Sequence, residues 1–197
     1  MRTCVRGRYR MLPYLYDQAC NCHLKGIPML RPLLLEFPED PVARIQELSY
    51  MLGDSLLVAP AFEREEYEVY LPKGKWMNLR TEELLEGGRF VKVAPGVDEI
   101  PVFLRENRIL PLLKEEKPEH VPEGEFRNLE VTLVYQSEVN ADFYDQDEQG
   151  NEKRYYFHAY PGKEQRTLRV DTDMDVCSIH LVSEQKYDEI YLNGSLL

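Results

Sequence analysis

The hydrophobic positions change periodicity along the chain, and this change divides it into three regions. From about Arg8 to Gly53 the pattern predicts a helix, a short strand and a second helix. Pro13 marks the expected start of the first regular helix, and Lys25 followed by Gly26 marks its end. Apolar residues recur in this helix at helical spacing, which predicts one apolar face. The members of that face are Met11, Leu12, Leu15, Ala19 and Cys22.

The segment from Ile27 to Pro38 is almost continuously apolar, which is typical of a strand covered on both faces in a parallel sheet. Pro28 and Pro32 lack backbone donors, so pairing is expected to involve only a few residues. Asp40 and Pro41 then predict the start of the second helix, with Asp40 as its N-cap. Gly53 is expected to close it.

The remaining two regions show the alternation and turn spacing of antiparallel β structure. Residues 54–113 hold a buried strand at 56–59, an alternating strand at 66–71, and turns at 72–75 and 87–88. Residues 114–125 are rich in charge and proline and are predicted to be a linker. From Phe126 onward six further strands are expected, at 129–135, 139–144, 154–160, 167–170, 176–181 and 189–192.

Composition narrows the classes of function. Hydrophobic residues make up 43% and charged residues 30%, which predicts a folded globular chain. The net charge of −11 argues against binding to nucleic-acid backbones, because such surfaces need clustered Lys and Arg. We find neither a membrane-length apolar run nor a secretory h-region, so we expect a cytoplasmic protein that does not associate with membranes.

The four cysteines are expected to be reduced thiols. They are Cys4, Cys20, Cys22 and Cys177. Cys20, Cys22 and His23 lack the second ligand pair of a structural zinc site, so no metal is predicted.

Three phrases in collinear order resemble glycoside hydrolase family 31, the α-glucosidases and α-xylosidases. They occupy residues 8–16 (RYRMLPYLY), 26–41 (GIPMLRP with EFPEDP) and 50–60 (YMLGDSLLVAP). Weaker similarity continues at residues 70–76 and 100–105. The resemblance is strong to about residue 113 and moderate beyond.

The resemblance implies a mainly β fold, in which a partial (β/α)8-barrel end precedes two small antiparallel β-sandwich domains. Residues 1–53 would be the C-terminal remnant of a TIM-type barrel, with its last strand and flanking helices. Residues 54–113 would form the proximal sandwich, 114–125 the linker and 126–197 the distal sandwich. Such an isolated barrel end would leave several leucines without neighbours, so we expect residues 1–53 to be poorly packed.

The family relationship also implies a reaction, the retaining hydrolysis of α-xylosidic or α-glucosidic bonds. Retention requires two carboxyl groups about 5 Å apart. In the family both are aspartates within motifs such as DMNE and HDIGG, and neither motif occurs in this sequence. We therefore expect no catalytic residue, an inactive isolated chain, no cofactor, and an α-linked substrate only in the intact enzyme. A separately encoded barrel portion is a possible partner.

Arg31 and Glu36 are the candidate substrate-binding residues, since they fall near the end of the expected last barrel strand. A salt bridge or a loop anchor is an equally good interpretation. Trp76 is expected in a sandwich core. A group of acidic residues is expected in a solvated surface turn, namely Asp142, Asp145, Asp147 and Glu148. The alternative function is a non-catalytic β-sandwich module with a structural or carbohydrate-binding role.

Overall fold

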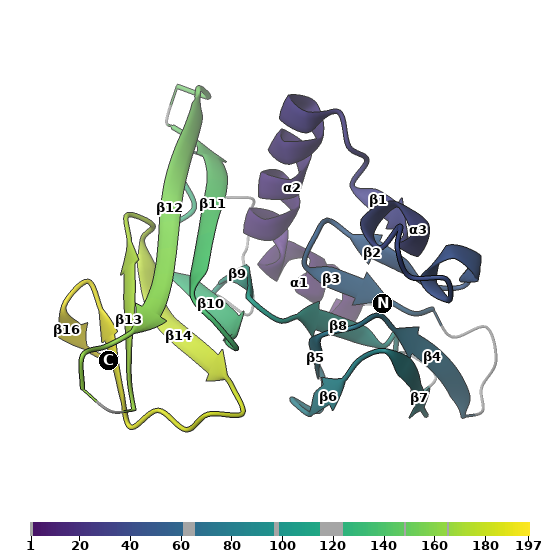
Figure 1. Cartoon of the computed structure of the whole chain (residues 1–197). Helices are drawn as coiled ribbons and strands as arrows, with labels where there is room; N and C mark the ends of the chain where they lie inside the picture. The colour runs from purple at the N-terminus through teal and green to yellow at the C-terminus, as the bar shows by residue number, and fades with distance from the viewer. Residues whose placement is uncertain (1, 61–65, 97–98, 115–123, 148, 165) are drawn as a thin grey trace. The chain divides into compact units, whose positions relative to one another are not determined.

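A computed structural model describes residues 2–60, 66–96, 99–114, 124–147, 149–164 and 166–197. The fold is mainly β (Figure 1), with several antiparallel sheets and few helices, as predicted. The chain forms two compact units. One contains Met1–Ile27 with Ile109–Leu197, and the other contains Pro28–Arg108. The segment 1–53, expected to be a single barrel remnant, is therefore divided between the two units after Ile27.

The unit Pro28–Arg108 is built from a six-stranded and a two-stranded sheet. The six-stranded sheet has the order β1-β2-β3-β8-β5-β6, and the smaller sheet pairs β4 with β7. The strands are β1 Leu30–Pro32, β2 Tyr50–Leu52, β3 Leu56–Val58, β4 Tyr67–Leu71, β5 Lys75–Asn78, β6 Leu84–Glu86, β7 Arg89–Val93 and β8 Val102–Arg105. Between β1 and β2 lie the helix α3 Leu33–Glu36 and the 3-10 helix η1 Ala43–Ile45.

The segment expected to be a buried parallel strand differs from the prediction. Only Leu30–Pro32 is extended, and it pairs antiparallel with β2. The chain then turns directly into α3, because Pro32 cannot donate a further ladder hydrogen bond. Leu33 is fully buried in this unit, but Leu30, Leu34 and Leu35 are 46–60% exposed. Poor packing is therefore wrong for Leu33, and for the other three leucines it stays a prediction.

The predicted second helix is reduced to a single turn. Oδ1 of Asp40 accepts hydrogen bonds from the backbone N–H groups of Val42 (2.9 Å) and Ala43 (3.1 Å), so the predicted cap is present. The helix does not continue, because only Ala43–Ile45 form η1. Gly53 closes no helix; it follows β2, and its N–H donates to the carbonyl of Met29.

The core of this unit surrounds Trp76, as predicted. Its side chain is fully buried, and its indole N–H donates to the carbonyl of Pro72 at 2.7 Å. Phe37 packs edge-on against the indole, with ring centroids 6.1 Å apart. The predicted turn at Gly87–Gly88 joins β6 to β7, and Gly88 adopts φ 73°, which glycine tolerates without strain.

The other unit combines two helices with two sheets. Its helices are α1 Arg2–Arg10 and α2 Leu12–Lys25. One sheet has the order β14-β10-β9 and the other the order β11-β12-β13-β15-β16. The strands are β9 Arg108–Leu113, β10 Leu129–Val134, β11 Val139–Gln146, β12 Glu152–Pro161, β13 Thr167–Thr172, β14 Val176–Val182, β15 Glu189–Leu192 and β16 Ser195–Leu196. Within the described part of the chain, no helix is both long and apolar enough to cross a membrane.

The six strands predicted after Phe126 are all present, but their pairing is not purely antiparallel. β10 runs parallel to β14, and β13 runs parallel to β15. The turn at Asn193–Gly194 has two positive φ values, 48° and 82°, and it pairs β15 with the short β16. Most of the predicted linker lies outside the described residues.

Helix α2 lies beside β11, the edge strand of the five-stranded sheet (Figure 1). Its predicted boundaries at Pro13 and Gly26 are confirmed, and Gly26 adopts φ 65°. Its predicted apolar face is wrong, because Ala19 is exposed and the other members are only half-buried. The buried residues of the helix are Pro13, Tyr14, Asp17, Gln18 and Asn21.

A polar helix face is buried here because a strand edge presents unpaired backbone donors and acceptors. Oδ1 of Asp17 accepts the backbone N–H of Tyr144 on β11 at 2.9 Å. The side-chain amides of Gln18 and Asn21 donate to the same carboxylate, at 2.8 and 3.2 Å. An aliphatic face would leave the Tyr144 N–H without a partner. The expectation of poor packing before residue 53 is therefore wrong for α2.

The predicted acidic surface turn is corrected, because Asp142 and Asp145 lie on β11 itself and only Asp147 follows the strand. Asp145 is fully buried and accepts the backbone N–H groups of Phe126 (2.8 Å) and Gln146 (2.7 Å). Burial raises the pKa of its carboxyl above the ordinary range. Asp142 and Asp147 remain at the surface, paired with Arg154 and with Asn151 respectively. Glu148 lies outside the described residues.

Replacing Asp17 with Ala is expected to loosen β11 without affecting the other unit. The substitution leaves the Tyr144 N–H unpaired, so amide exchange in β11 should accelerate about 30-fold, equivalent to about 2 kcal/mol. Hydrogen exchange read by mass spectrometry measures the effect. Trp76, the only tryptophan, reports the other unit through its fluorescence, and its urea midpoint should not move.

Asp17→Asn is the matched variant, because its carbonyl oxygen can still accept from Tyr144. It should retain most of the protection in β11. Equal acceleration in both variants would show that the hydrogen bond to Tyr144 does not secure the strand.

Asp145→Asn should change the pH dependence of stability. Because the folded pKa of Asp145 is raised, the folded chain binds this proton more tightly than the unfolded chain. The wild type therefore loses stability as pH rises from the ordinary carboxyl range through the raised pKa. The Asn variant has no carboxyl group to titrate at this position. Its free energy of unfolding relative to that of the wild type should therefore increase over the same pH range.

Thermal unfolding followed by circular dichroism from pH 4 to 8 measures the Asp145 difference. Asp142→Asn is the matched control, since it removes the same charge from an exposed position of the same strand. A constant stability difference between wild type and Asp145→Asn at every pH would contradict the prediction.

Candidate functional site

Arg31 and Glu36, the two candidates from the sequence, form an ion pair within one unit. Nη1 of Arg31 lies 3.0 Å from Oε2 of Glu36, and Nε of Arg31 donates to the carbonyl of Pro28 at 2.9 Å. Nη1 of Arg105, at the end of β8, lies 3.2 Å from the other carboxylate oxygen, Oε1. We call Arg31, Glu36 and Arg105 the ionic cluster. The sequence did not identify Arg105 as a member, since it lies 69 residues beyond Glu36.

The side chains of the ionic cluster are largely buried. Side-chain exposure is 7% for Arg31, 18% for Glu36 and 25% for Arg105. The guanidinium of Arg105 also lies 4.6 Å from the centre of the Phe37 ring, which itself packs against Trp76. Burial lowers the pKa of Arg105, with the charge of Arg108 acting in the same direction.

The geometry gives Glu36 little freedom to act as an acid or base. Each of its two carboxylate oxygens already faces a guanidinium, and both arginines carry permanent charge. The arrangement fixes the end of β1 to the end of β8. The salt-bridge interpretation therefore describes the positions of Arg31 and Glu36, and contact with a sugar stays a prediction.

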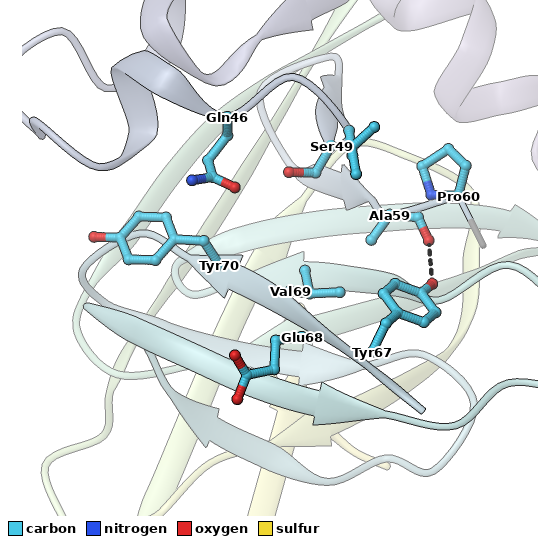
Figure 2. Close-up of a pocket in the computed structure, with 9 residues that line it drawn as sticks. Gln46, Ser49, Ala59, Pro60, Tyr67, Glu68, Val69 and Tyr70 are labelled. Carbon is cyan, nitrogen blue, oxygen red and sulfur yellow. Dashed lines mark hydrogen bonds between the residues drawn. The ribbon is translucent and has the colours of Figure 1, made fainter. Parts of the chain in front are cut away.

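A cavity of about 240 Å³ lies in the same unit beside β4, which among the described strands pairs with β7 alone. Figure 2 shows Gln46 and Ser49 on one side of it and Tyr67 on the other. The phenol of Tyr67 donates to the carbonyl of Ala59 at 2.8 Å, drawn as a dashed line. Glu68 is the only carboxylate among the described residues that line this cavity.

The polar groups beside this cavity hold its wall together. Tyr70 donates its phenol proton to Oδ2 of Asp40 at 2.7 Å. Burial, assisted by this hydrogen bond, raises the pKa of Tyr70 to about 12. Burial alone would raise the pKa of Asp40, but hydrogen bonds from Tyr70, Ala43 and Val42 together lower it. The described part of the cavity lining thus presents one carboxylate, where retaining hydrolysis requires two facing each other.

The remaining sequence candidates do not assemble a centre. Cys20, Cys22 and His23 lie on α2, and Cys20 and Cys22 are free thiols. Within the described ranges, no group of three or more His, Cys, Asp or Glu side chains is arranged to hold a metal ion. Asp145 faces backbone donors in the core and not an open cavity.

Comparison with known proteins gives consistent matches. Residues 26–110 match the family model described as the glycosyl hydrolase family 31 C-terminal domain. An α-glucosidase of Saccharolobus solfataricus is 41% identical over 113 residues, which is 57% of this chain and 16% of that enzyme. An α-xylosidase of the same organism is 39% identical over 112 residues, covering 55% of this chain and 15% of that enzyme.

Solved structures give the same relationship. A cycloalternan-forming enzyme from Listeria monocytogenes, in complex with a pentasaccharide substrate, superposes with a TM-score of 0.69 at 29% identity. The match covers 77% of this chain and 15% of that one. The chain therefore spans about one sixth of the length of the relatives it matches. The matched region contains the ionic cluster, the cavity beside β4 and the core around Trp76, and the match identifies residues 26–110 as a C-terminal portion of glycosyl hydrolase family 31.

Proposed function

We propose that this chain is the C-terminal part of a retaining α-glycosidase that hydrolyses α-xylosidic or α-glucosidic bonds. In this proposal the two catalytic aspartates belong to a barrel portion and not to these residues. The observation that carries it is the match of residues 26–110 to the family model, together with 39–41% identity to an α-xylosidase and an α-glucosidase.

The proposed partner surface is an exposed apolar set on the segment from β1 to β2. We call it the leucine surface, and it consists of Leu30, Leu34, Leu35, Ile45 and Leu48. These side chains are 46–74% exposed, and all five lie within one stretch of 19 residues. Exposed apolar residues gathered on one segment are typical of a surface that packs against another protein part. A barrel portion of the same family would cover this surface.

Glu36 has a positioning role in this proposal. By holding Arg31 and Arg105, it fixes the segment that carries the leucine surface to β8. Correct presentation of that surface would depend on the ionic cluster. This role places Glu36 outside direct contact with the sugar.

The purified 197-residue chain should not hydrolyse aryl α-glucosides or aryl α-xylosides. A retaining mechanism needs a nucleophile and an acid flanking the same bond, and the proposal assigns neither to this chain. Release of nitrophenol over the buffer rate, followed for hours at high protein concentration, measures any activity. Turnover by a preparation free of host enzymes would refute the proposal.

A graft provides the positive test. The matching C-terminal segment of the Saccharolobus solfataricus α-glucosidase, or of its α-xylosidase, is replaced by this chain. Either chimera should hydrolyse its aryl glycoside, whereas the truncated enzyme without a graft should be inactive or insoluble. Two folded chimeras without activity would contradict the assignment.

Glu36→Gln in an active chimera separates positioning from sugar contact. Removing the carboxylate leaves Arg31 and Arg105 without their shared partner, so the graft should lose about 2 kcal/mol of stability. The loss is measured by urea unfolding, and KM should be unchanged. Glu66→Gln is the matched control, because Glu66 pairs with Lys92 at the surface and should have little effect. A raised KM with unchanged stability would instead place Glu36 in the sugar site.

A non-catalytic carbohydrate-binding role is the second candidate function. One observation favours it: Tyr156 is 49% exposed on β12, and the next two alternate residues of that strand, His158 and Tyr160, are also aromatic. This role is compatible with the first, because binding and hydrolysis would involve different residues.

A further inference from the structure

The five-stranded sheet of the unit with α2 has one buried and one open face. Along β12, Tyr155, Phe157 and Ala159 are buried in the core. The intervening residues Tyr156 and His158 therefore point to the opposite face, because successive side chains of a strand alternate. Tyr160 continues the same series. We call this side of the sheet the outer face.

The strand register brings polar residues beside these aromatic rings. On β11, Asn140 stands opposite His158, and Asp142 stands opposite Tyr156. On β13, Asp171 stands opposite His158. The outer face therefore places hydrogen-bonding side chains on both sides of an aromatic row.

The aromatic row extends across β13 to β15. Arg169 stands opposite Tyr160 on one side and opposite Tyr191 on the other. Its guanidinium lies 5.5 Å from the centre of the Tyr191 ring. Four strands of the sheet thus contribute to the outer face.

Several of these rings are fixed before any ligand binds. His158 and Tyr160 stack with centroids 4.5 Å apart. The phenol of Tyr160 donates to Oδ2 of Asp171 at 2.7 Å, and the phenol of Tyr191 donates to Oε2 of Glu189 at 3.0 Å. Fixed side chains lose little conformational entropy on binding, which favours recognition.

The outer face carries charged side chains of both signs. Arg154 pairs with Asp142 at 2.7 Å, and Nε2 of His158 lies 2.7 Å from Oε1 of Glu138. The face therefore offers aromatic surface and hydrogen bonds without a field of one sign. Phosphate backbones require clustered positive charge, and the centre of a protein interface is depleted of charged residues. An uncharged ligand rich in hydroxyl groups suits this composition better than either.

We propose that the outer face binds a neutral, extended oligosaccharide, with Tyr156 as its exposed stacking platform. This inference rests on the second proposed function and names its site. The backbone of a strand rises about 7 Å for every two residues, so the stretch from Tyr156 to Tyr160 is about 14 Å long, the length of several sugar units in a row. The Asn140, Asp142 and Asp171 side chains supply hydrogen-bonding groups along that row, where donors and acceptors can meet sugar hydroxyls.

Affinity electrophoresis of the full chain tests the site. Native gels contain soluble starch, dextran or xyloglucan as neutral probes, and heparin as an acidic one. At least one neutral polysaccharide should retard the wild type, and heparin should not. Tyr156→Ala should weaken this binding about three- to tenfold, the usual range for loss of one aromatic contact. Tyr156→Phe should bind like wild type.

Phe90→Ala is the matched control, because Phe90 is also 49% exposed but lies on β7 in the other unit. It should leave polysaccharide binding unchanged. Hydrogen exchange of the wild-type chain tests the site without a substitution. The polysaccharide that retards the chain should slow exchange in peptides of β12 and not in those of β7.

The outcomes distinguish binding at the outer face from carbohydrate binding elsewhere on the chain. Absence of retardation in all three neutral gels, or retardation by heparin alone, would refute both carbohydrate binding and the outer face. Wild-type binding that survives Tyr156→Ala, without protection of β12, would refute the outer face alone. Neither result bears on hydrolysis by the grafted enzyme.

Discussion

The structure depends on how the open edges of its small sheets are covered. An edge strand presents a row of unpaired backbone groups that must find partners. At β11 the partner is Asp17 of α2, whose carboxylate accepts the Tyr144 N–H. The edge of β2 is covered by β1, which pairs with it through three residues, and the Gly53 N–H adds a hydrogen bond to the carbonyl of Met29. Both solutions use residues from the first 53 positions, so this segment helps to complete both units.

Buried polar groups hold the strand that borders the proposed glycan site. Asp17 fixes β11 from the side of the helix, and Asp145 fixes its end by accepting two backbone N–H groups. The same strand carries Asn140 and Asp142 on the outer face. The positions of Asn140 and Asp142 therefore depend on hydrogen bonds made in the interior. A substitution that weakens those bonds should also weaken carbohydrate binding at the outer face.

The surface proposed to contact a barrel portion and the face proposed to bind carbohydrate belong to different units of the chain. The ionic cluster and the leucine surface lie within Pro28–Arg108, the unit that contains most of the family match. The outer face belongs to the unit with α2, where the identity to the Saccharolobus enzymes does not extend over the whole length. Each unit has its own core, so one surface can diverge without unpacking the other.

The sequence by itself determined the mainly β class, the strands after Phe126, the limits of α2, the burial of Trp76 and the family relationship. These follow from alternation, turn residues and local motifs, which act over short distances. It misassigned the buried face of α2, the length of the helix after Asp40 and the burial of Asp145. Only the tertiary structure decided the buried face of α2 and the burial of Asp145, because each carboxylate accepts a backbone N–H that is distant in the sequence, from Tyr144 and Phe126 respectively. The pairing of Arg105 with Glu36 has the same cause: the two residues meet only after β1 and β8 are placed in one sheet.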